Sequence, residues 1–94
     1  MAKATARHIL VNTAEECEAI KDKINSGVSD FSEAAKSHSN CPSGRQGGDL
    51  GEFSLGQMVK EFNDVVFSEA LHTVHGPVKT QFGYHLIEIT SRTD

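Results

Sequence analysis

The amino-acid sequence predicts a single α+β domain, in which a mixed, mostly antiparallel sheet packs against helices. Apolar residues alternate with a period of two near both ends of the chain, as in strands, and recur with a helical period in between. The last two strand patterns follow one another directly, as in a hairpin. The chain has 94 residues, so we expect one domain over residues 1–94, with a core just large enough to fold without disulfides.

The first strand and the first helix follow from local signals. In the strand expected over residues 5–11, even-numbered side chains face one side of the sheet and odd-numbered side chains face the other. Thr13 and Glu16 form a capping-box pattern that begins a helix ending near residue 26. Gly27 is a typical residue at a helix C-terminus.

A second helix is expected to begin after Asp30, a favourable N-cap residue, and to end near residue 40. Pro42 sets that end, because a proline disfavours helical backbone in the residue before it. Residues 43–48 are rich in glycine and indicate a loop, and residues 49–54 indicate a short second strand.

The second half of the chain predicts one more helix and two strands. Apolar residues at helical spacing place the helix at about residues 59–67. Gly76-Pro77 is expected to interrupt the chain before a short strand over residues 78–80. The final strand is expected over residues 83–91, where side chains alternate again.

Composition argues against several classes of protein. There are 13 acidic and 9 basic residues, and the basic ones are scattered along the chain, so we expect neither nucleic acid nor a membrane surface as a partner. Cys17 and Cys41 do not make a disulfide framework, and Cys17 is expected to be buried in the first helix. Without the apolar run of a signal peptide or of a membrane span, we expect a cytoplasmic protein.

The five histidines fall into two groups. His38, His72 and His75 are expected on the surface of helices or loops. His8 and His85 instead lie in strand patterns and share their faces with core-type residues. From spacing alone two interpretations stay open for this pair: two separately satisfied core histidines, or two rings that meet across the sheet and support a site.

The spacing of reactive residues bears on three other kinds of site. His38-x-x-Cys41 and His72-x-x-His75 together supply a four-ligand set for zinc, although a whole strand and helix separate them. Cys41 with a histidine partner would suit a thiol hydrolase, although the chain has no recognised nucleophile signature. The glycines of residues 44–51 do not form a phosphate-binding loop, because no Gly-Lys-Ser/Thr follows and they precede a strand, so a turn with close backbone packing is expected.

Taken together, several segments resemble the successive motifs of the parvulins, a family of peptidyl-prolyl cis/trans isomerases. They occur in the family's order and cover nearly the whole chain: His8-Ile9-Leu10-Val11, Gly47-Gly48-Asp49-Leu50-Gly51-Glu52-Phe53, Gly56-Gln57-Met58-Val59, Phe62 and Phe82-Gly83-Tyr84-His85-Leu86-Ile87. The resemblance implies a four-stranded, mostly antiparallel sheet surrounded by about four helices. The chain also resembles the small stand-alone bacterial members of the family, so we expect no separate module in front of the domain.

The resemblance implies a site with two parts. His8, Cys41, Thr80 and His85 match a catalytic network, in which the histidines lie on neighbouring strands. Four apolar residues match the substrate-binding surface: Leu50, Met58, Phe62 and Phe82. Phe82 stands where some relatives have a smaller polar residue, which implies a more apolar pocket.

The implied activity is rotation about X-Pro bonds, by a non-covalent mechanism that needs neither metal nor cofactor. Phospho-directed relatives carry a basic cluster after the first strand, whereas Asn12 to Glu16 is acidic here, so we expect unphosphorylated, apolar-flanked polypeptide substrates and a role in protein folding. The alternative is a chaperone-like domain that binds peptides without turning them over. We expect a monomer.

Overall fold

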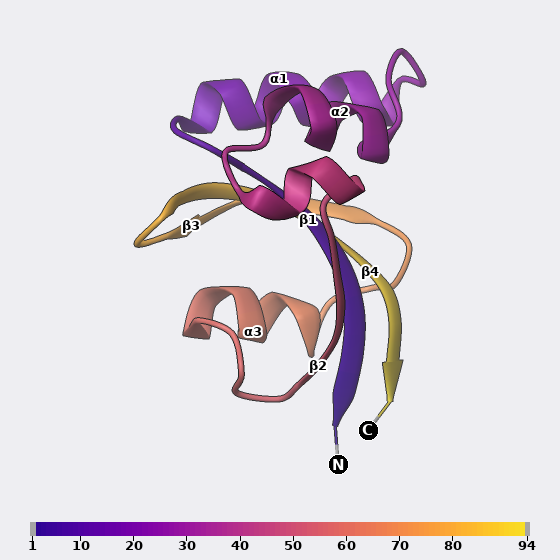
Figure 1. Cartoon of the computed structure of the whole chain (residues 1–94), viewed down its shortest axis with the longest axis vertical. Helices are drawn as coiled ribbons and strands as arrows, with labels where there is room; N and C mark the ends of the chain where they lie inside the picture. Colours follow the sequence, from indigo (N-terminus) through magenta and orange to yellow (C-terminus); the bar gives the residue numbers. More distant parts are fainter. Residues whose placement is uncertain (1, 94) are drawn as a thin grey trace.

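The computed structural model describes residues 2–93. It has the α+β architecture predicted from the sequence, with one four-stranded antiparallel sheet in the order β2-β1-β4-β3 (Figure 1). In these residues there are three α-helices and one short 3₁₀ helix, where about four helices were expected. The elements are β1 (Lys3–Val11), α1 (Ala14–Asn25), α2 (Phe31–His38), the 3₁₀ helix η1 (Pro42–Gln46), β2 (Asp49–Ser54), α3 (Lys60–Val66), β3 (Val74–Thr80) and β4 (Gly83–Thr93).

Both predicted N-caps are present. The hydroxyl of Thr13 accepts a hydrogen bond from the backbone N–H of Glu16 at 3.2 Å, and the carboxylate of Asp30 accepts one from Glu33 at 2.8 Å. These bonds satisfy amide groups that have no partner inside the first turn of a helix. They explain why α1 and α2 begin where the sequence predicts.

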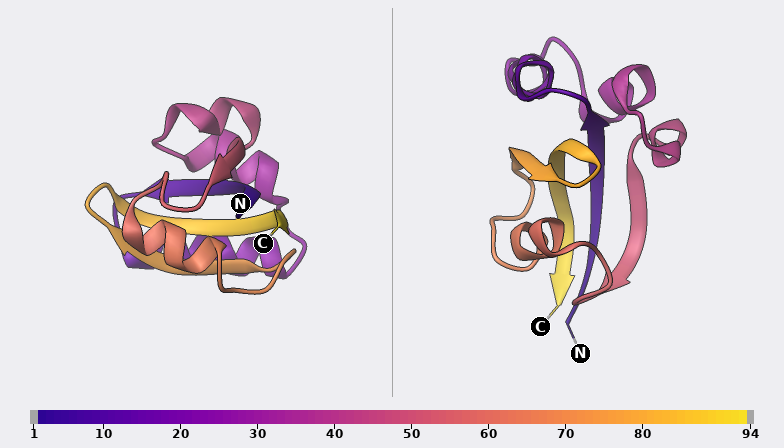
Figure 2. Two further views of the ribbon diagram at one scale, coloured as in Figure 1. Left: turned by 90° about the horizontal axis from the view of Figure 1, so that it is seen from below. Right: turned by 90° about the vertical axis from the view of Figure 1, so that its left-hand side faces the viewer.

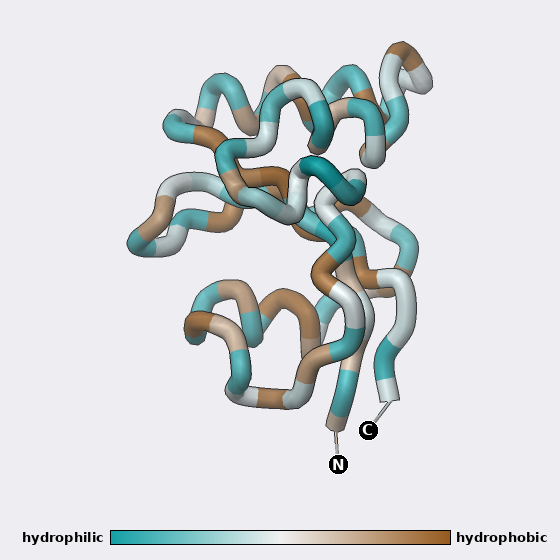
Figure 3. The backbone as a smooth tube through the Cα atoms, in the orientation of Figure 1, coloured by the Kyte–Doolittle hydropathy of each residue, from teal (hydrophilic) through white to brown (hydrophobic). Residues whose placement is uncertain are grey.

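The alternation along the strands sorts side chains onto two faces of the sheet. Ile9 and Val11 pack with α1 and α2 on one face, whereas Ala4 and Ala6 pack with α3 on the other. The helices are correspondingly separated in space, with α1 and α2 together at one end of the molecule and α3 beside the other end (Figures 1 and 2). Along α1, single apolar residues interrupt a mainly polar helix, which leaves one face for the core (Figure 3).

Strand β3 is longer than predicted and corrects one expectation. It begins at Val74 and runs through Gly76-Pro77, which was expected to break the chain. The pairing of β3 with β4 is irregular between His75 and Val78, so Gly76 and Pro77 lie in a local irregularity of the strand. β3 is an edge strand, where a proline without an N–H can be accommodated.

The glycine-rich segment packs closely on its neighbours. Residues 42–46 form η1 where a loop was predicted, because Pro42 suits the first turn of a helix. Gly47 and Gly48 have positive φ values of 72° and 84°. A Cβ atom on Gly48 would lie 2.3 Å from the carbonyl oxygen of His8, so only glycine allows β1 and the segment after η1 to approach this closely.

Among the helices of residues 2–93, none has both the length and the apolar character that a membrane-crossing helix needs.

Candidate active site

A buried pair of histidines lies at the centre of the sheet. His8 on β1 and His85 on β4 are 5% and 3% exposed, and their Nδ1 atoms are 3.0 Å apart. The two rings are nearly parallel, with an interplanar angle of 16°. The structure therefore selects the interpretation in which the two histidines meet across neighbouring strands.

The histidine pair is the middle of a longer hydrogen-bonded chain. The hydroxyl of Ser43 lies 3.1 Å from Nε2 of His8 and donates to Sγ of Cys41 at 3.3 Å. At the other end, Oγ1 of Thr80 lies 2.8 Å from Nε2 of His85. The hydrogen-bonded chain thus runs from the half-buried Cys41 thiol to the buried Thr80 hydroxyl and connects η1 with the C-terminal end of β3.

The proton positions along this chain are coupled, because a neutral imidazole donates from one ring nitrogen and accepts at the other. When His85 donates from Nδ1 to His8, the Nε2–H of His8 donates to Ser43, and the hydroxyl hydrogen of Ser43 is free to bond Cys41. With the opposite placement, Ser43 donates to His8 and Cys41 loses that donor. The state of the pair therefore decides whether the sulfur receives a hydrogen bond.

Both imidazoles are held in the neutral form. Burial, reinforced by the nearby His85, lowers the pKa of His8 from 6.5 to about 4. Burial also lowers the pKa of His85. A buried pair with no acidic partner disfavours an imidazolium ion, since the charge would lose its hydration without compensation. The pair is therefore neutral at physiological pH and serves as a donor–acceptor bridge.

An apolar depression of about 380 Å³ borders the histidines. Every predicted site residue except Thr80 lines it, and Thr80 reaches it only through His85. Phe62 of α3 is a buried part of the wall: its ring meets His8 edge-on, with the ring centroids 5.5 Å apart, and His85 with the centroids 5.7 Å apart. The predicted site residues therefore converge on one cavity: His8, Cys41, Leu50, Met58, Phe62, Phe82 and His85.

The comparisons with known proteins agree with this geometry. The model of the rotamase family described as "PPIC-type PPIASE domain" matches residues 4–91. The chain belongs to this family. It is a peptidyl-prolyl cis/trans isomerase domain of the parvulin type, as the resemblance in the sequence implied.

Among curated relatives of this parvulin domain, the foldase protein PrsA of Geobacillus sp. strain WCH70 is 44% identical over 98% of the chain. The foldase protein PrsA 4 of Bacillus cereus is 41% identical over 98% of the chain. The parvulin domain corresponds to 33% of each of these relatives, so it spans about a third of the length of the curated relatives it matches.

Two solved structures show how closely the fold is shared. NmPin, the parvulin of Nitrosopumilus maritimus, is 38% identical with a TM-score of 0.84, and the match covers 97% of this chain and 98% of that one. PrsA from Bacillus anthracis is 37% identical with a TM-score of 0.93, and the match covers 99% of this chain and 43% of that one. The four-stranded sheet and its helices are thus those of a parvulin.

Ser43 is the residue of the network that the sequence did not reveal. It lies two residues after Cys41 in a segment rich in Ser, Gly and Pro, where a hydroxyl usually satisfies a turn. A residue that joins a half-buried cysteine to a buried histidine cannot be recognised from spacing, since the link depends on how η1 sits against β1. Other pocket-lining residues also escaped the sequence analysis: Leu10, Asn40, Pro42 and Val59.

The alternative chemistries gain no support in residues 2–93. There, no three His, Cys, Asp or Glu side chains come together as metal ligands, so the two His/Cys pairs of the zinc hypothesis stay apart. His38 and His72 are exposed, as expected, but His75 is half-buried in β3 and bonds the carbonyl oxygen of Ala70 at 2.8 Å. Cys41 contacts Ser43 instead of a histidine, which is not the arrangement of a thiol hydrolase.

Proposed function

We propose that this parvulin domain rotates X-Pro bonds in unphosphorylated polypeptide segments that carry an apolar residue before the proline, and that it does so without a covalent intermediate. The isomerase class follows from the family. One observation supports the finer proposal: the cavity beside the histidine network is walled almost entirely by apolar side chains. Such a surface suits a proline ring and an apolar neighbour.

In this proposal the apolar surroundings of the amide accelerate the rotation, and no nucleophile or acid–base group is required. Resonance in the planar amide sets a barrier of about 18–20 kcal/mol, and uncatalysed exchange takes tens to hundreds of seconds. The planar amide is more charge-separated than the twisted one, so an apolar wall destabilises the ground state relative to the transition state. Leu50, Met58 and Phe62 supply that wall. Met58 can adjust its flexible thioether to different neighbouring residues.

The hydrogen-bonded network contributes electrostatics and position. Cys41 lines the cavity, so in this proposal its sulfur faces the amide group that rotates. Through Ser43 and His8, the sulfur is connected to the neutral histidine pair, which fixes donors and acceptors beneath the cavity. The thiol then acts by polarity and shape, and no bond to substrate forms.

The residue before proline is expected to be apolar. Leu10 and the 60% exposed Phe82 line the cavity and offer apolar surface at its edge. A phosphate would need cations to replace its hydration. Arg7 is not available, because it is paired with Glu88 at 2.5 Å and lies over the ring of Phe31.

The test compares peptides that differ only in the residue before proline. NMR exchange measurements of cis/trans rates should show faster turnover with Leu or Phe than with phosphoserine or phosphothreonine, at low and at moderate salt, since screening would reveal any long-range charge effect. A clear preference for the phosphopeptides at either salt would overturn the proposed substrate class.

A domain that only held peptides would have no use for the coupled network beside the cavity, so the chaperone-like alternative is not favoured. The two foldase relatives share one third of their length with this domain. By analogy with these foldases, we propose that the substrates of this domain are unfolded chains. The monomeric state and the cytoplasmic location expected from the sequence remain predictions.

A further inference from the structure

A second depression adjoins the apolar cavity. Its volume is about 370 Å³, and Asn40, Cys41 and Pro42 line both depressions. The two therefore share one border, formed by the segment between α2 and η1. An extended peptide that places its proline in the apolar cavity would reach the second depression within a few residues, since each extended residue spans about 3.3–3.6 Å.

The second depression carries positive charge. Lys36 of α2 and Arg45 of η1 line it, and no carboxylate does. Both side chains are exposed, and within residues 2–93 neither takes part in an ion pair. In a chain with 13 acidic and 9 basic residues, two cations that line one depression without acidic partners are a local exception to the overall charge.

The fold, not the sequence order, brings these two cations together. Gly44 packs against the C-terminal end of α2, where a Cβ atom would lie 2.9 Å from the carbonyl oxygen of Ala35. This close contact sets η1 directly beside α2 and places Arg45 on the same depression as Lys36. Ser39 also lines this depression, and its hydroxyl oxygen accepts hydrogen bonds from the N–H groups of Leu10 and Cys41, which holds the side chain in place and leaves its hydroxyl hydrogen able to donate.

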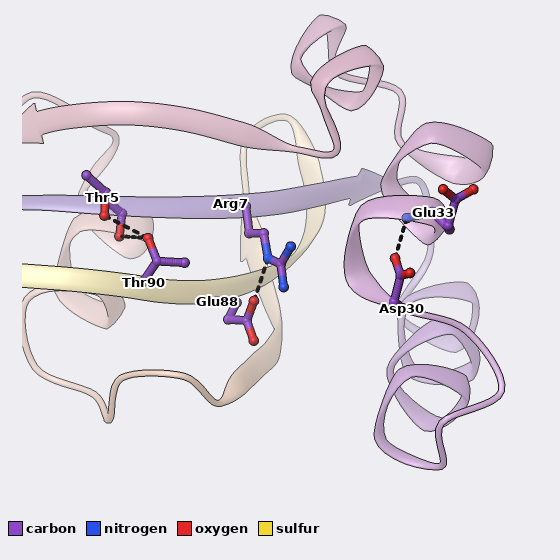
Figure 4. Close-up of polar contacts among 6 residues, drawn as sticks. All are labelled: Thr5, Arg7, Asp30, Glu33, Glu88 and Thr90. Carbon is purple, nitrogen blue, oxygen red and sulfur yellow. Dashed lines mark hydrogen bonds and ion pairs between the residues drawn. The ribbon is translucent and has the colours of Figure 1, made fainter.

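A different depression, of about 590 Å³, shows the contrast. Arg7 lines it, but Glu88 on the neighbouring strand β4 holds the guanidinium, as Figure 4 shows. Asp30 and Glu33 also line it, so its charge is mixed and acidic on balance. The one cation that lines that depression, Arg7, is neutralised by Glu88, whereas Lys36 and Arg45 have no ion-pair partner within residues 2–93 and can meet a ligand.

We propose that Lys36 and Arg45 form a subsite for an acidic side chain, Asp or Glu, located two or three residues from the proline of the substrate. This inference rests on the proposed function, and it adds a charged determinant to an otherwise apolar recognition surface. The residue next to proline contacts the apolar cavity, and the chain then passes Cys41 and Pro42 to reach the two cations.

The test is a scan of matched peptides with leucine before proline and either Glu or its neutral isostere Gln at each position up to four residues on both sides. NMR exchange should give a kcat/KM ratio, Glu over Gln, of about threefold to tenfold at one or two adjacent positions, the size expected for two exposed ion pairs. The ratio should fall between 20 and 200 mM salt, because exposed charges are screened. In the variant Lys36→Gln/Arg45→Gln the ratio should fall to about one.

A matched variant removes two cations elsewhere. Lys3→Gln/Lys23→Gln changes the net charge by the same amount, but neither residue lines the two depressions. The Glu-over-Gln ratio of this variant should therefore equal that of the unmodified domain. A Glu-over-Gln ratio of one at every position would overturn the subsite, and so would a ratio that stays unchanged in Lys36→Gln/Arg45→Gln. So would a preference of more than about tenfold for phosphoserine over Glu at the same position, which would assign the two cations to phosphate instead.

Failure of the proposed function gives a different result. If the unmodified domain accelerated none of the peptides, the isomerisation proposal would fall, and the subsite would then be decided by binding. Titration with the Glu peptide should shift the amide signals of Lys36 and Arg45 more than titration with the Gln peptide. Equal shifts would overturn the subsite by that route as well.

Discussion

His8 and His85 are diagonal neighbours across β1 and β4, and not a directly opposed pair. In the strand register His8 is opposite Ile87, and His85 is opposite Leu10, yet the Nδ1 atoms of the two rings are 3.0 Å apart. Diagonal neighbours on one face of a sheet are within reach of ring-sized side chains. The contact between the two rings is therefore fixed by the register of the two central strands, so the geometry of the site depends on the packing of the sheet.

The first prediction concerns the coupling of these two residues. His8→Ala and His85→Ala should each lower the free energy of unfolding by about 1–3 kcal/mol, because each leaves a buried ring nitrogen without its partner. The double variant should lose less than the sum of the two, as expected for residues in contact. Urea denaturation of the four proteins measures this. His38→Ala, on the exposed face of α2, is the control and should change little; additive losses would mean that the rings do not interact.

The second prediction concerns stability at low pH. Because the folded pKa of His8 is about 4, below its ordinary 6.5, the unfolded chain binds this proton first as the pH falls. The stabilisation is therefore complete above about pH 6.5 and lost towards pH 4, by roughly 3 kcal/mol for His8, and the lowered pKa of His85 acts in the same direction.

Denaturation at several pH values should show about half of this loss between pH 7 and 5, above most of the carboxylate titrations. The slope should be shallower in His8→Gln and unchanged in the exposed control His38→Gln. If the unmodified domain were equally stable across this range, the histidine pair would have to accept protons without cost in the folded state.

The parts of the structure that could be predicted share a local cause. Thr13 and Asp30 cap helices through bonds within three residues, and the alternation around His8 and His85 follows from strand geometry. These features need no knowledge of the tertiary fold. The convergence of the site residues came instead from the resemblance to the parvulins, since spacing alone left the histidine pair open.

The features that were missed depend on packing between distant segments. Gly76-Pro77 normally signals a break, but at the edge of the sheet a missing N–H has no partner to lose, so β3 continues through it. Ser43 and the Lys36–Arg45 depression depend on the approach of η1 to β1 and α2, which glycines at 44 and 48 permit. Nothing in the local sequence reports that approach.

The third prediction separates the cavity wall from the core. Met58 is half-buried, so Met58→Ala should lower kcat/KM by about tenfold through lost apolar contact with the proline ring, with a small change in Tm. Phe62 is 3% exposed and also packs on Phe53, so Phe62→Ala should lose activity and about 3–5 kcal/mol of stability together.

Leu55 provides the control for Met58, because it is 57% exposed and does not line the cavity. Leu55→Ala should keep both kcat/KM and Tm near the unmodified values. Thermal unfolding measures Tm, and NMR exchange on one peptide measures kcat/KM, for both variants. A Met58→Ala domain with full activity would remove Met58 from the substrate surface.

The last prediction concerns the role of Cys41. A covalent mechanism would need its sulfur as a nucleophile, and any substitution would then abolish turnover. The structure favours an electrostatic role, because the sulfur accepts a hydrogen bond from Ser43, which in turn contacts the neutral histidine pair. Cys41→Asp keeps an acceptor at this place and should retain a good part of the activity, whereas Cys41→Ala loses the acceptor and should fall by about tenfold, the equivalent of one hydrogen bond.

Ser43→Ala tests the same link from the other side. It leaves the thiol in place but removes its donor, so in an electrostatic mechanism it should lower kcat/KM by an amount similar to Cys41→Ala, and the two losses should not add. In a nucleophilic mechanism Cys41→Ala and Cys41→Asp would both be inactive, and mass spectrometry of the unmodified domain during turnover would detect a peptide bound to Cys41. That adduct would refute the non-covalent mechanism, because a sulfur that only polarises the amide never leaves one.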